Sequence, residues 1–156
     1  MAEAARKRDK NLYERDFYAW TQDQAAKLRA RAHNDIDWEN AAEEIESLGR
    51  SDKREIRTRM GVLIKHLLKW KYQPARRSES WLATISEQRA NIQAVIADSP
   101  SLRQFPADVL DWAWAWGVRD AAREAGLPPG DLPASPEFSV DEVLDDAFLP
   151  GEPWTA

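Results

Sequence analysis

Residues 51–71 read SDKREIRTRMGVLIKHLLKWK, and the spacing of the apolar residues in this stretch decides the fold class. The apolar residues follow one another at intervals of four, three, four and three positions, which places them on one face of an α-helix. These residues are Ile56, Met60, Leu63, Leu67 and Trp70. The stretch therefore predicts a core-facing helix, and Pro74 ends it because proline disfavours a helical conformation in the preceding residue.

Helical periodicity continues on both sides of this stretch. It predicts helices over about 12–32, 35–48, 78–98 and 106–126. In the second of these helices, a core stripe is expected at Trp38, Ala41, Ala42, Ile45 and Leu48. Gly49 and Ser51 could end this helix and cap the next one, or they could lie inside one long bent helix, and a break or bend is expected here. Ser78 or Ser80 is expected to cap the next helix, and Gly126 is expected to close the last one.

The chain changes character after Gly126. Residues 127–138 hold four of the nine prolines and are expected to be extended and irregular. Ser139 and Glu142 form a capping-box pattern, which predicts a short helix through Phe148. The apolar side of this helix should dock on the rest of the chain through Val140, Val143, Leu144 and Phe148.

These elements together predict an all-α fold. We expect a single-domain bundle of four or five helices with a Pro-rich, acidic C-terminal extension and a short terminal helix. Residues 1–11 have no apolar period and should be disordered. Residues 12–126 should form the bundle, and residues 127–156 should dock on it.

The charges are distributed unevenly along the chain. The formal net charge is −5, yet residues 127–156 contain seven acids and neither Lys nor Arg. Residues 50–77 contain ten basic and two acidic residues, a net charge of +8. We expect the acidic extension to face this basic segment, although the segment could instead bind an external anion.

The composition excludes several classes of function. The 156 residues contain no Cys, which excludes disulfides, thiol catalysis and Cys-ligated metal sites. No apolar run approaches the ~18 residues of a membrane span, and the first residues lack the apolar region of a signal peptide. The chain is therefore expected to be soluble and cytoplasmic, without a membrane partner.

Bases and aromatic residues are densest between the helices predicted at 51–71 and 78–98. Cations neutralise phosphates and aromatic rings stack on bases, so this combination indicates binding of an anion or a single-stranded nucleic acid. The candidate ligands are Lys65, Lys69, Lys71, Tyr72, Arg76 and Arg77. A solvated helix face explains the same cations, and Trp70 and Trp81 lie on predicted core stripes, which leaves Tyr72 to stack.

Three tryptophans alternate at 112, 114 and 116 within a run whose composition favours a helix. In a helix, Trp112 and Trp116 share a face, whereas Trp114 points almost the other way and has no obvious position in the core. Aromatic residues anchor many protein interfaces, so Trp114 is a candidate for binding a partner protein or a second copy of the chain.

Gln88 and Arg89 interrupt the apolar face of the helix predicted over 78–98. Buried polar groups need partners, so we expect a buried polar network in which Arg89 binds Glu43 or Glu44. This network is expected to be structural, because an Arg on a core-facing turn usually satisfies a carboxylate of a neighbouring helix.

No motif indicates a metal, a cofactor or catalysis. A di-iron helical bundle needs a His three residues after a Glu, and neither His33 nor His66 has this spacing. A nucleophile elbow and a phosphate-binding loop are also absent from the sequence. We expect His66 to be half-buried and satisfied within the fold. The remaining enzymatic hypothesis is a polar site in the bundle, around Glu43, Glu46, His66 and Arg89.

Several longer strings resemble a known family. They are LYERDFYAW (12–20), EEIESLGR (43–50), LLKWKYQP (67–74), RSESW (77–81), ISEQR (85–89) and DDAFLP (145–150). Over about residues 11–150 the chain resembles the bacterial family known as domain of unknown function number twenty-nine. The resemblance implies a small, all-helical, single-domain protein, and it implies no activity, cofactor or catalytic residue.

The sequence as a whole favours a helical protein-interaction or regulatory module without catalytic activity, which binds another protein or itself. The alternative is binding of an anion or single-stranded nucleic acid through residues 50–77, and the third hypothesis is an enzyme with a polar bundle site. Affinity for a nucleic acid should fall steeply with salt, whereas capture of a protein through apolar anchors should depend on salt only weakly.

Overall fold

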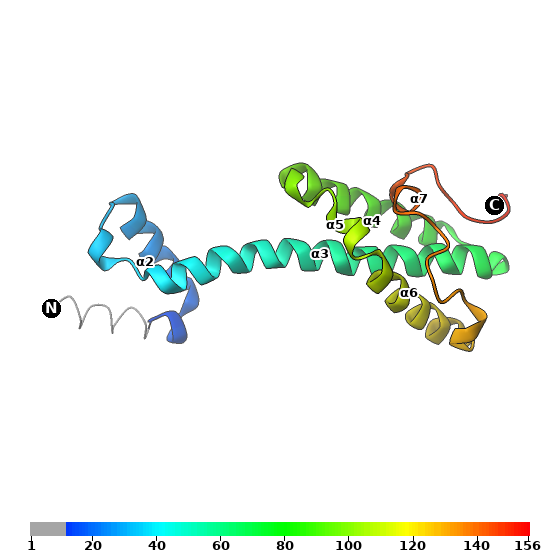
Figure 1. Cartoon of the computed structure of the whole chain (residues 1–156), viewed down its shortest axis with the longest axis horizontal. Helices are drawn as coiled ribbons and strands as arrows, with labels where there is room; N and C mark the ends of the chain where they lie inside the picture. Colours follow the sequence, from blue (N-terminus) through cyan, green and yellow to red (C-terminus); the bar gives the residue numbers. More distant parts are fainter. Residues whose placement is uncertain (1–11) are drawn as a thin grey trace. The chain divides into compact units, whose positions relative to one another are not determined.

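A computed structural model describes residues 12–156, except for the side chain of Pro129. The predicted disorder of residues 1–11 lies outside the described residues. The described residues form helices joined by turns and short irregular segments, with no strand among them, which confirms the all-α fold class (Figure 1). The chain divides into two compact units. The first ends at Ser51, and the second comprises Asp52–Ala156.

The main helix of the first unit is α2 (Phe17–Arg29). Residues 12–15 form a separate helical turn, because Asp16 leaves the helical conformation and its carboxylate accepts a hydrogen bond from the backbone N–H of Ala19. The helix expected over 12–32 is therefore divided. A 3-10 turn (His33–Asp35) leads from α2 to α3 (Trp38–Tyr72).

The core of the first unit is small. Trp20 and Ile36 are its buried apolar residues among those described. Gln24 is buried beside them, and its side-chain oxygen accepts a hydrogen bond of 2.7 Å from the backbone N–H of Asp37. This bond joins a side chain of α2 to the backbone of the residue that directly precedes α3.

The helix α3 is continuous from Trp38 to Tyr72, so the predicted break at Gly49 is wrong. A glycine inside a helix costs only about 1 kcal/mol relative to alanine. Arg50 forms ion pairs with Glu43 and Glu46, two turns and one turn earlier, and these pairs favour a continuous helix through the glycine.

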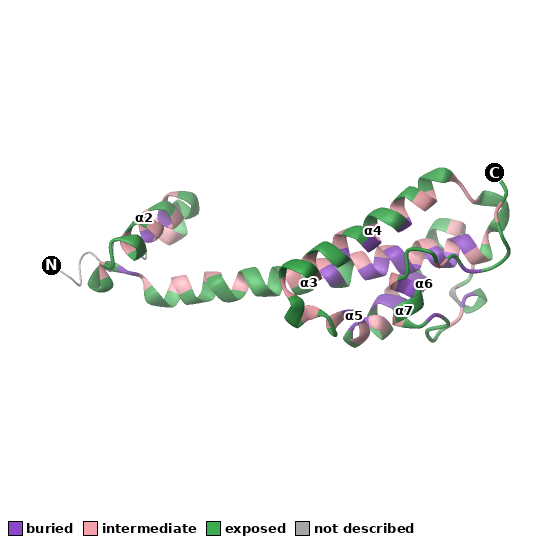
Figure 2. Cartoon of the chain, turned by 90° about the horizontal axis from the view of Figure 1, so that it is seen from above, coloured by how far each residue is buried: buried purple, intermediate pink, exposed green. Residues whose placement is uncertain are grey.

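The second unit packs α4 (Glu79–Asp98) and α6 (Leu110–Ala125) against α3. The five residues of the stripe predicted at 56–70 are each at most 1% exposed, which confirms that stripe as core. From α4, Ile85 and Ile92 join the same core, and α6 contributes Ala113 and Trp114. Figure 2 shows the buried residues where these helices meet.

Several helix ends of the second unit follow the predicted signals. The Ser78 hydroxyl accepts a hydrogen bond from the backbone N–H of Trp81 and caps α4. Gly126 adopts the left-handed conformation with φ of 67° and closes α6, which a residue with a Cβ atom rarely does. The helix expected from about Pro106 is divided, however, because Val109 leaves the helical conformation between α5 (Phe105–Asp108) and α6.

Two glycines let α3 and α6 approach closely. A Cβ atom on Gly117 would lie 3.1 Å from the backbone nitrogen of Lys65, and one on Gly61 would lie 2.7 Å from the ring of Trp116. Because the first of these contacts is with backbone, a larger residue at position 117 would force the two helices apart.

The segment after Gly126 belongs to the second unit. A 3-10 turn (Pro129–Asp131) precedes α7 (Val140–Leu144). Ser139 and Glu142 form the predicted capping box at the start of α7, each side chain accepting a hydrogen bond from the other residue's backbone N–H. Leu132, Phe138 and Val143 are buried in the same core as α3, and Val140, Leu144 and Phe148 pack against it.

Candidate functional site

Lys65 and Lys69, two of the predicted anion ligands, form an ion-pair cluster with α6. Lys65 Nζ lies 3.1 Å from Asp120 Oδ2 and 2.9 Å from Glu124 Oε1, and Lys69 Nζ lies 2.8 Å from Glu124 Oε2. Lys69 Nζ also lies over the ring of Trp81, 4.5 Å from its centre. The two lysine side chains are only 12% and 13% exposed, so acids of the same unit neutralise both charges.

The cluster shifts the acid–base properties of its members. Hydrogen bonds from Lys69 and Lys65 lower the pKa of the Glu124 carboxyl to about 2. Burial lowers the pKa of Lys65, but hydrogen bonds to Glu124 and Asp120 outweigh burial and raise this pKa above its usual value. Lys65 and Glu124 therefore remain ionised across the neutral pH range.

We expect Glu124→Gln to lower the free energy of unfolding by about 1 kcal/mol near neutral pH, since Glu124 is 38% exposed and solvent screens its ion pairs. The folded-state pKa is lowered, so the stabilisation is fully present above about pH 5 and is lost as the pH falls toward 2. Urea titrations at about pH 6 and about pH 3 should show the difference between the natural chain and the variant shrinking at the lower pH.

The matched control for this prediction is Glu87→Gln, which replaces an exposed acid of α4. This control should leave the free energy of unfolding within about 0.5 kcal/mol at both pH values. A Glu124→Gln effect of the same size at both pH values would contradict the ion-pair origin of the stabilisation.

Lys71 and Tyr72 share one carboxylate of the C-terminal segment. Lys71 Nζ forms an ion pair with Glu137 Oε1, and the Tyr72 hydroxyl donates a hydrogen bond of 2.7 Å to Glu137 Oε2. The Tyr72 ring is 37% exposed, but its hydroxyl is held by this bond. The two residues predicted to bind a phosphate and a base are thus engaged with an acid of the same chain.

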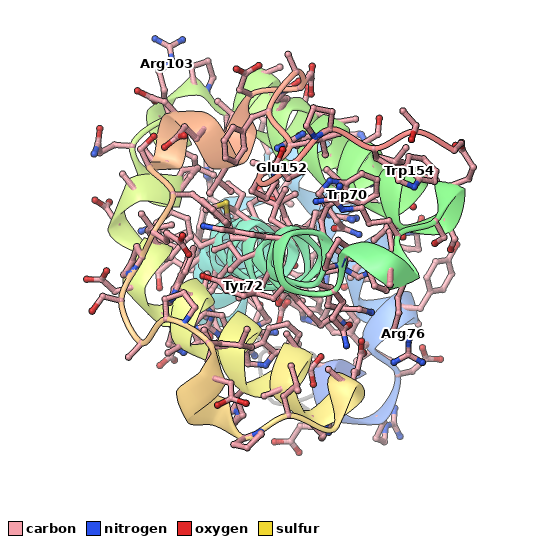
Figure 3. All side chains as sticks on the ribbon, turned by 90° about the vertical axis from the view of Figure 1, so that its right-hand side faces the viewer. Trp70, Tyr72, Arg76, Arg103, Glu152 and Trp154 are labelled. Carbon is pink, nitrogen blue, oxygen red and sulfur yellow. The ribbon has the colours of Figure 1, made fainter. Side chains whose placement is uncertain are left out.

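Arg77 holds the end of the C-terminal segment. Its Nε donates to the Trp70 carbonyl at 2.7 Å, and one of its terminal nitrogens donates to the Glu152 carbonyl at 2.6 Å. The Trp154 ring packs edge-on against the Trp70 ring, with ring centres 5.3 Å apart. Figure 3 labels both residues at this end of α3. Among the described residues, Arg76 is the one predicted anion ligand whose side chain has neither an ion pair nor a hydrogen bond.

The prediction that Trp114 has no position in the core is wrong. Its side chain is 0% exposed, and the indole N–H donates a hydrogen bond of 2.8 Å to the Pro133 carbonyl. The Phe138 ring packs edge-on against it with a centre separation of 5.3 Å. The C-terminal segment therefore provides the pocket for Trp114, and the exposed tryptophan of α6 is Trp112 at 45%.

The partners predicted for Arg89 are also wrong. Arg89 is 1% exposed, and its Nε donates to the Val143 carbonyl at 2.8 Å while a terminal nitrogen donates to the Phe148 carbonyl at 2.9 Å. These acceptors are backbone carbonyls near the end of α7 and after the following turn, and a carbonyl acceptor requires no particular residue type that the sequence could reveal. Burial lowers the pKa of Arg89, and the charges of Asp146 and Asp145 oppose this shift.

The other members of the predicted polar network bind elsewhere. Gln88 accepts a hydrogen bond of 3.2 Å from Arg59. Within the first unit, Glu44 accepts a hydrogen bond from the Tyr13 hydroxyl, and Glu43 pairs with Arg50. Each of the four residues therefore has its own set of contacts instead of the shared network expected from the sequence.

His66 is half-buried, as predicted. Its Nδ1 lies 2.8 Å from the Val62 carbonyl in the preceding turn of α3, and burial lowers the pKa of the imidazole. The other residues of the enzymatic hypothesis are Glu43 and Glu46, which pair with Arg50, and Arg89, which binds carbonyls. Because these four residues make separate contacts, they do not form the shared polar site that the enzymatic hypothesis requires.

An exposed apolar face on the first unit is the feature that the sequence analysis missed. Trp38, Ile45 and Leu48 of α3 are 54%, 69% and 71% exposed, although the periodicity predicted them as core. None of the α3 residues up to Ser51 is buried, and Figure 2 shows this part of the helix in the colours of exposed and intermediate residues. We refer to Trp38, Ile45 and Leu48 as the α3 apolar face.

The α3 apolar face is held in a defined geometry. At 100° per residue, Ile45 lies about 20° from Trp38 around the helix, and Leu48 lies about 60° from Ile45. The Trp38 ring stacks on His33 with centres 6.2 Å apart, and its indole N–H donates to the His33 carbonyl. The largest side chain of the face is therefore oriented by contacts that leave more than half of it exposed.

A row of acids lies on the other side of this part of α3, about 140° around the helix from the α3 apolar face. Glu39, Glu43 and Glu46 are exposed and lie within about 60° of one another. Arg50 continues this row and pairs with Glu43 and Glu46. The charged side chains of this part of α3 therefore point away from its three large apolar side chains.

The sequence offers no clear signal for this face. Residues 17–29 contain Phe17, Tyr18, Trp20 and Leu28, an apolar content that favours coverage of the stripe at 38–48. In the structure α2 buries Trp20 and the polar Gln24, whereas Phe17, Tyr18 and Leu28 are 49%, 74% and 44% exposed.

Comparison with known proteins places the chain in a family. Neither the curated proteins nor the solved structures give a match. No helix in residues 12–156 combines the length and the apolar character needed to cross a membrane, and these residues hold no cluster of His, Asp and Glu suited to a metal ion. A family model described as "Domain of unknown function DUF29" matches residues 12–149. The chain therefore belongs to this family.

Proposed function

We propose that this protein is a protein-interaction module that binds its partner through the α3 apolar face. The observation that carries the proposal is the exposure of Trp38, Ile45 and Leu48 on one side of a well-formed helix. Covering a large apolar side chain contributes roughly 1.5–3 kcal/mol, so a partner that covers all three gains substantial binding free energy. Clustered apolar side chains with a polar border are typical of interaction sites, and aromatic residues are frequent anchors in them.

Binding of an anion or a nucleic acid through residues 50–77 has less support. Lys65, Lys69 and Lys71 each form an ion pair within the second unit, and Arg77 donates to backbone carbonyls. A phosphate would have to displace these contacts before it could use the same cations. The enzymatic hypothesis has less support still, because its residues do not share a site.

The first test is the pair of substitutions Ile45→Ser and Leu48→Ser in one variant. Both side chains are largely exposed, so we expect the free energy of unfolding to change by no more than about 0.5 kcal/mol. Photo-crosslinking through benzoylphenylalanine at Ala42, which lies between Trp38 and Ile45, should give discrete crosslinked species in cells. The same species should be lost when the two serines are introduced.

The matched control places benzoylphenylalanine at Ala90, an exposed alanine of α4. This position should not give the species seen from position 42. Identical crosslinks from both positions, or crosslinks that persist in the Ile45→Ser, Leu48→Ser variant, would overturn the proposed function.

A further inference from the structure

We infer that the partner of the α3 apolar face is a second copy of the same chain, paired with the first in an antiparallel orientation. This inference rests on the proposed function and adds the identity of the partner. It follows from three properties of the first unit: the residues that surround the face, the order of their sizes, and the few apolar side chains that this unit buries by itself.

The residues of 38–49 divide by character around the helix. At 100° per residue, Ile45 and five others lie within about 60° of Ile45, and each of the six is apolar or glycine. We call this set the α3 stripe, and it consists of Trp38, Ala41, Ala42, Ile45, Leu48 and Gly49. The charged and polar residues of 38–49 all lie about 100° or more from Ile45. Two paired α3 stripes would therefore not place like charges at the centre of their interface.

The order of large and small residues on the α3 stripe fits a reversed copy of itself. A two-fold axis between positions 43 and 44 sets Trp38 of one copy opposite Gly49 of the other, and Ile45 opposite Ala42. Each large side chain then meets a small residue, as a closely packed interface requires. A parallel pairing in register would instead oppose Trp38 to Trp38 and Gly49 to Gly49. The order of sizes thus favours an antiparallel second copy.

Gly49 is a second observation that points to close approach of another helix. Glycine is less favourable than alanine inside a helix, and Gly49 lies within the continuous α3. A Cβ atom at this position would meet no other segment within 4 Å, so nothing in the described part of the chain requires a glycine. The missing side chain leaves room for the indole of Trp38 from a second copy.

The first unit buries few apolar residues of its own. Trp20 and Ile36 are its buried apolar side chains among the described residues, whereas the three residues of the α3 apolar face are at least 54% exposed. Units of about 40 residues usually need disulfides, a metal or oligomerisation to be stable, and the chain contains no Cys. A second copy is present wherever the chain is made, so it can cover the α3 stripe in every molecule.

The first experiment measures the oligomeric state of the full chain. Size-exclusion chromatography with light scattering should give twice the monomer mass of 17.8 kDa. The Ile45→Ser, Leu48→Ser variant should give the monomer mass. In cells, benzoylphenylalanine at position 42 should link two differently tagged copies of the chain.

The order of sizes is tested by Ala42→Ile, with Ala90→Ile on α4 as the matched control. Both alanines are exposed, so neither change should disturb the fold. Position 42 meets Ile45 of the other copy in the antiparallel pair, so the larger side chain should overpack the interface and raise the dimer Kd about ten-fold. The control should leave this Kd within about two-fold. A lower Kd for Ala42→Ile would contradict the antiparallel pairing.

Single cysteines test the orientation, because the chain has no Cys of its own. In the antiparallel pair, the two copies of position 42 are about 4.5 Å apart along the helix axis, and the two copies of position 49 are about 16 Å apart. A disulfide needs Cα atoms within about 7 Å of each other. Oxidation with glutathione should therefore link Ala42→Cys chains at least about ten-fold faster than Gly49→Cys chains.

The outcomes distinguish this inference from the proposed function. A monomer mass for the natural chain up to about 100 μM, or equal linking through positions 42 and 49, would overturn the antiparallel second copy. If the position-42 crosslinks join the chain to a different protein and are lost with the two serines, the second copy is overturned and the proposed function stands. Crosslinks that persist with the two serines, together with a monomer mass, would overturn both.

Discussion

Replacing Trp114 by Ala should lower the free energy of unfolding by about 5 kcal/mol, the largest effect that we expect from one substitution in this chain. Removing a fully buried tryptophan leaves a cavity, and Phe or Trp to Ala changes typically cost 3–5 kcal/mol, of the order of the whole stability of a small domain. The variant also leaves the Pro133 carbonyl without the indole donor and removes the packing surface of Phe138. The second unit should therefore be largely unfolded or close to its unfolding midpoint at 37 °C.

The control for this prediction is Trp112→Ala on the same helix. The Trp112 side chain is 45% exposed and lies under Arg57, whose guanidinium is 4.6 Å from the ring centre. Its loss should cost about 1 kcal/mol, mainly from the cation–π contact and partial burial. Thermal unfolding followed by circular dichroism should give a much lower melting temperature for Trp114→Ala than for Trp112→Ala. Similar melting temperatures for the two variants would contradict the core role of Trp114.

Arg89→Met should lower the free energy of unfolding by about 3 kcal/mol, the second largest effect. Methionine retains most of the side-chain length and apolar stem of arginine, so the change removes hydrogen bonds with little change in volume. The carbonyls of Val143 and Phe148 would lose their donors, and an unsatisfied buried acceptor costs about 1–3 kcal/mol. Removal of a buried cation offsets part of this loss.

Hydrogen exchange gives this prediction a local readout. The amides of α7 and of residues 145–150 should exchange faster in the Arg89→Met variant, whereas those of α2 should not change. Arg103→Met is the control, because Arg103 is exposed and should shift the free energy of unfolding by less than about 0.5 kcal/mol. Unchanged exchange in α7 would show that Arg89 does not hold this segment.

Local signals in the sequence predicted several helix ends of the second unit. The caps at Ser78, Gly126 and Ser139 depend on residues within a few positions of one another, so the sequence contains all the information that they need. The core stripe of α3 from Ile56 to Trp70 is likewise a periodic pattern within one helix. The break expected at Gly49 failed because a local helix penalty of about 1 kcal/mol is too small to stop a helix supported by ion pairs.

The errors at the candidate site have a different cause. Pro133 and Phe138 form the pocket of Trp114, and backbone carbonyls accept the hydrogen bonds of Arg89. These contacting groups are far in sequence from Trp114 and Arg89, so local sequence signals do not predict the contacts. The α3 apolar face shows a further limit. Periodicity identifies which side of a helix is apolar, but it does not state whether another element of the same chain covers that side.

The bonds of Arg89 also have a consequence for the order of events during synthesis. Its acceptors at positions 143 and 148 follow it by 54 and 59 residues. Ribosomes add about 5–20 residues per second, so about 3–12 s pass between the synthesis of Arg89 and the synthesis of its acceptors. Through this interval the nascent second unit presents a cation and the apolar surroundings of Ile85 and Ile92 to the solvent, where chaperone binding and aggregation compete with folding.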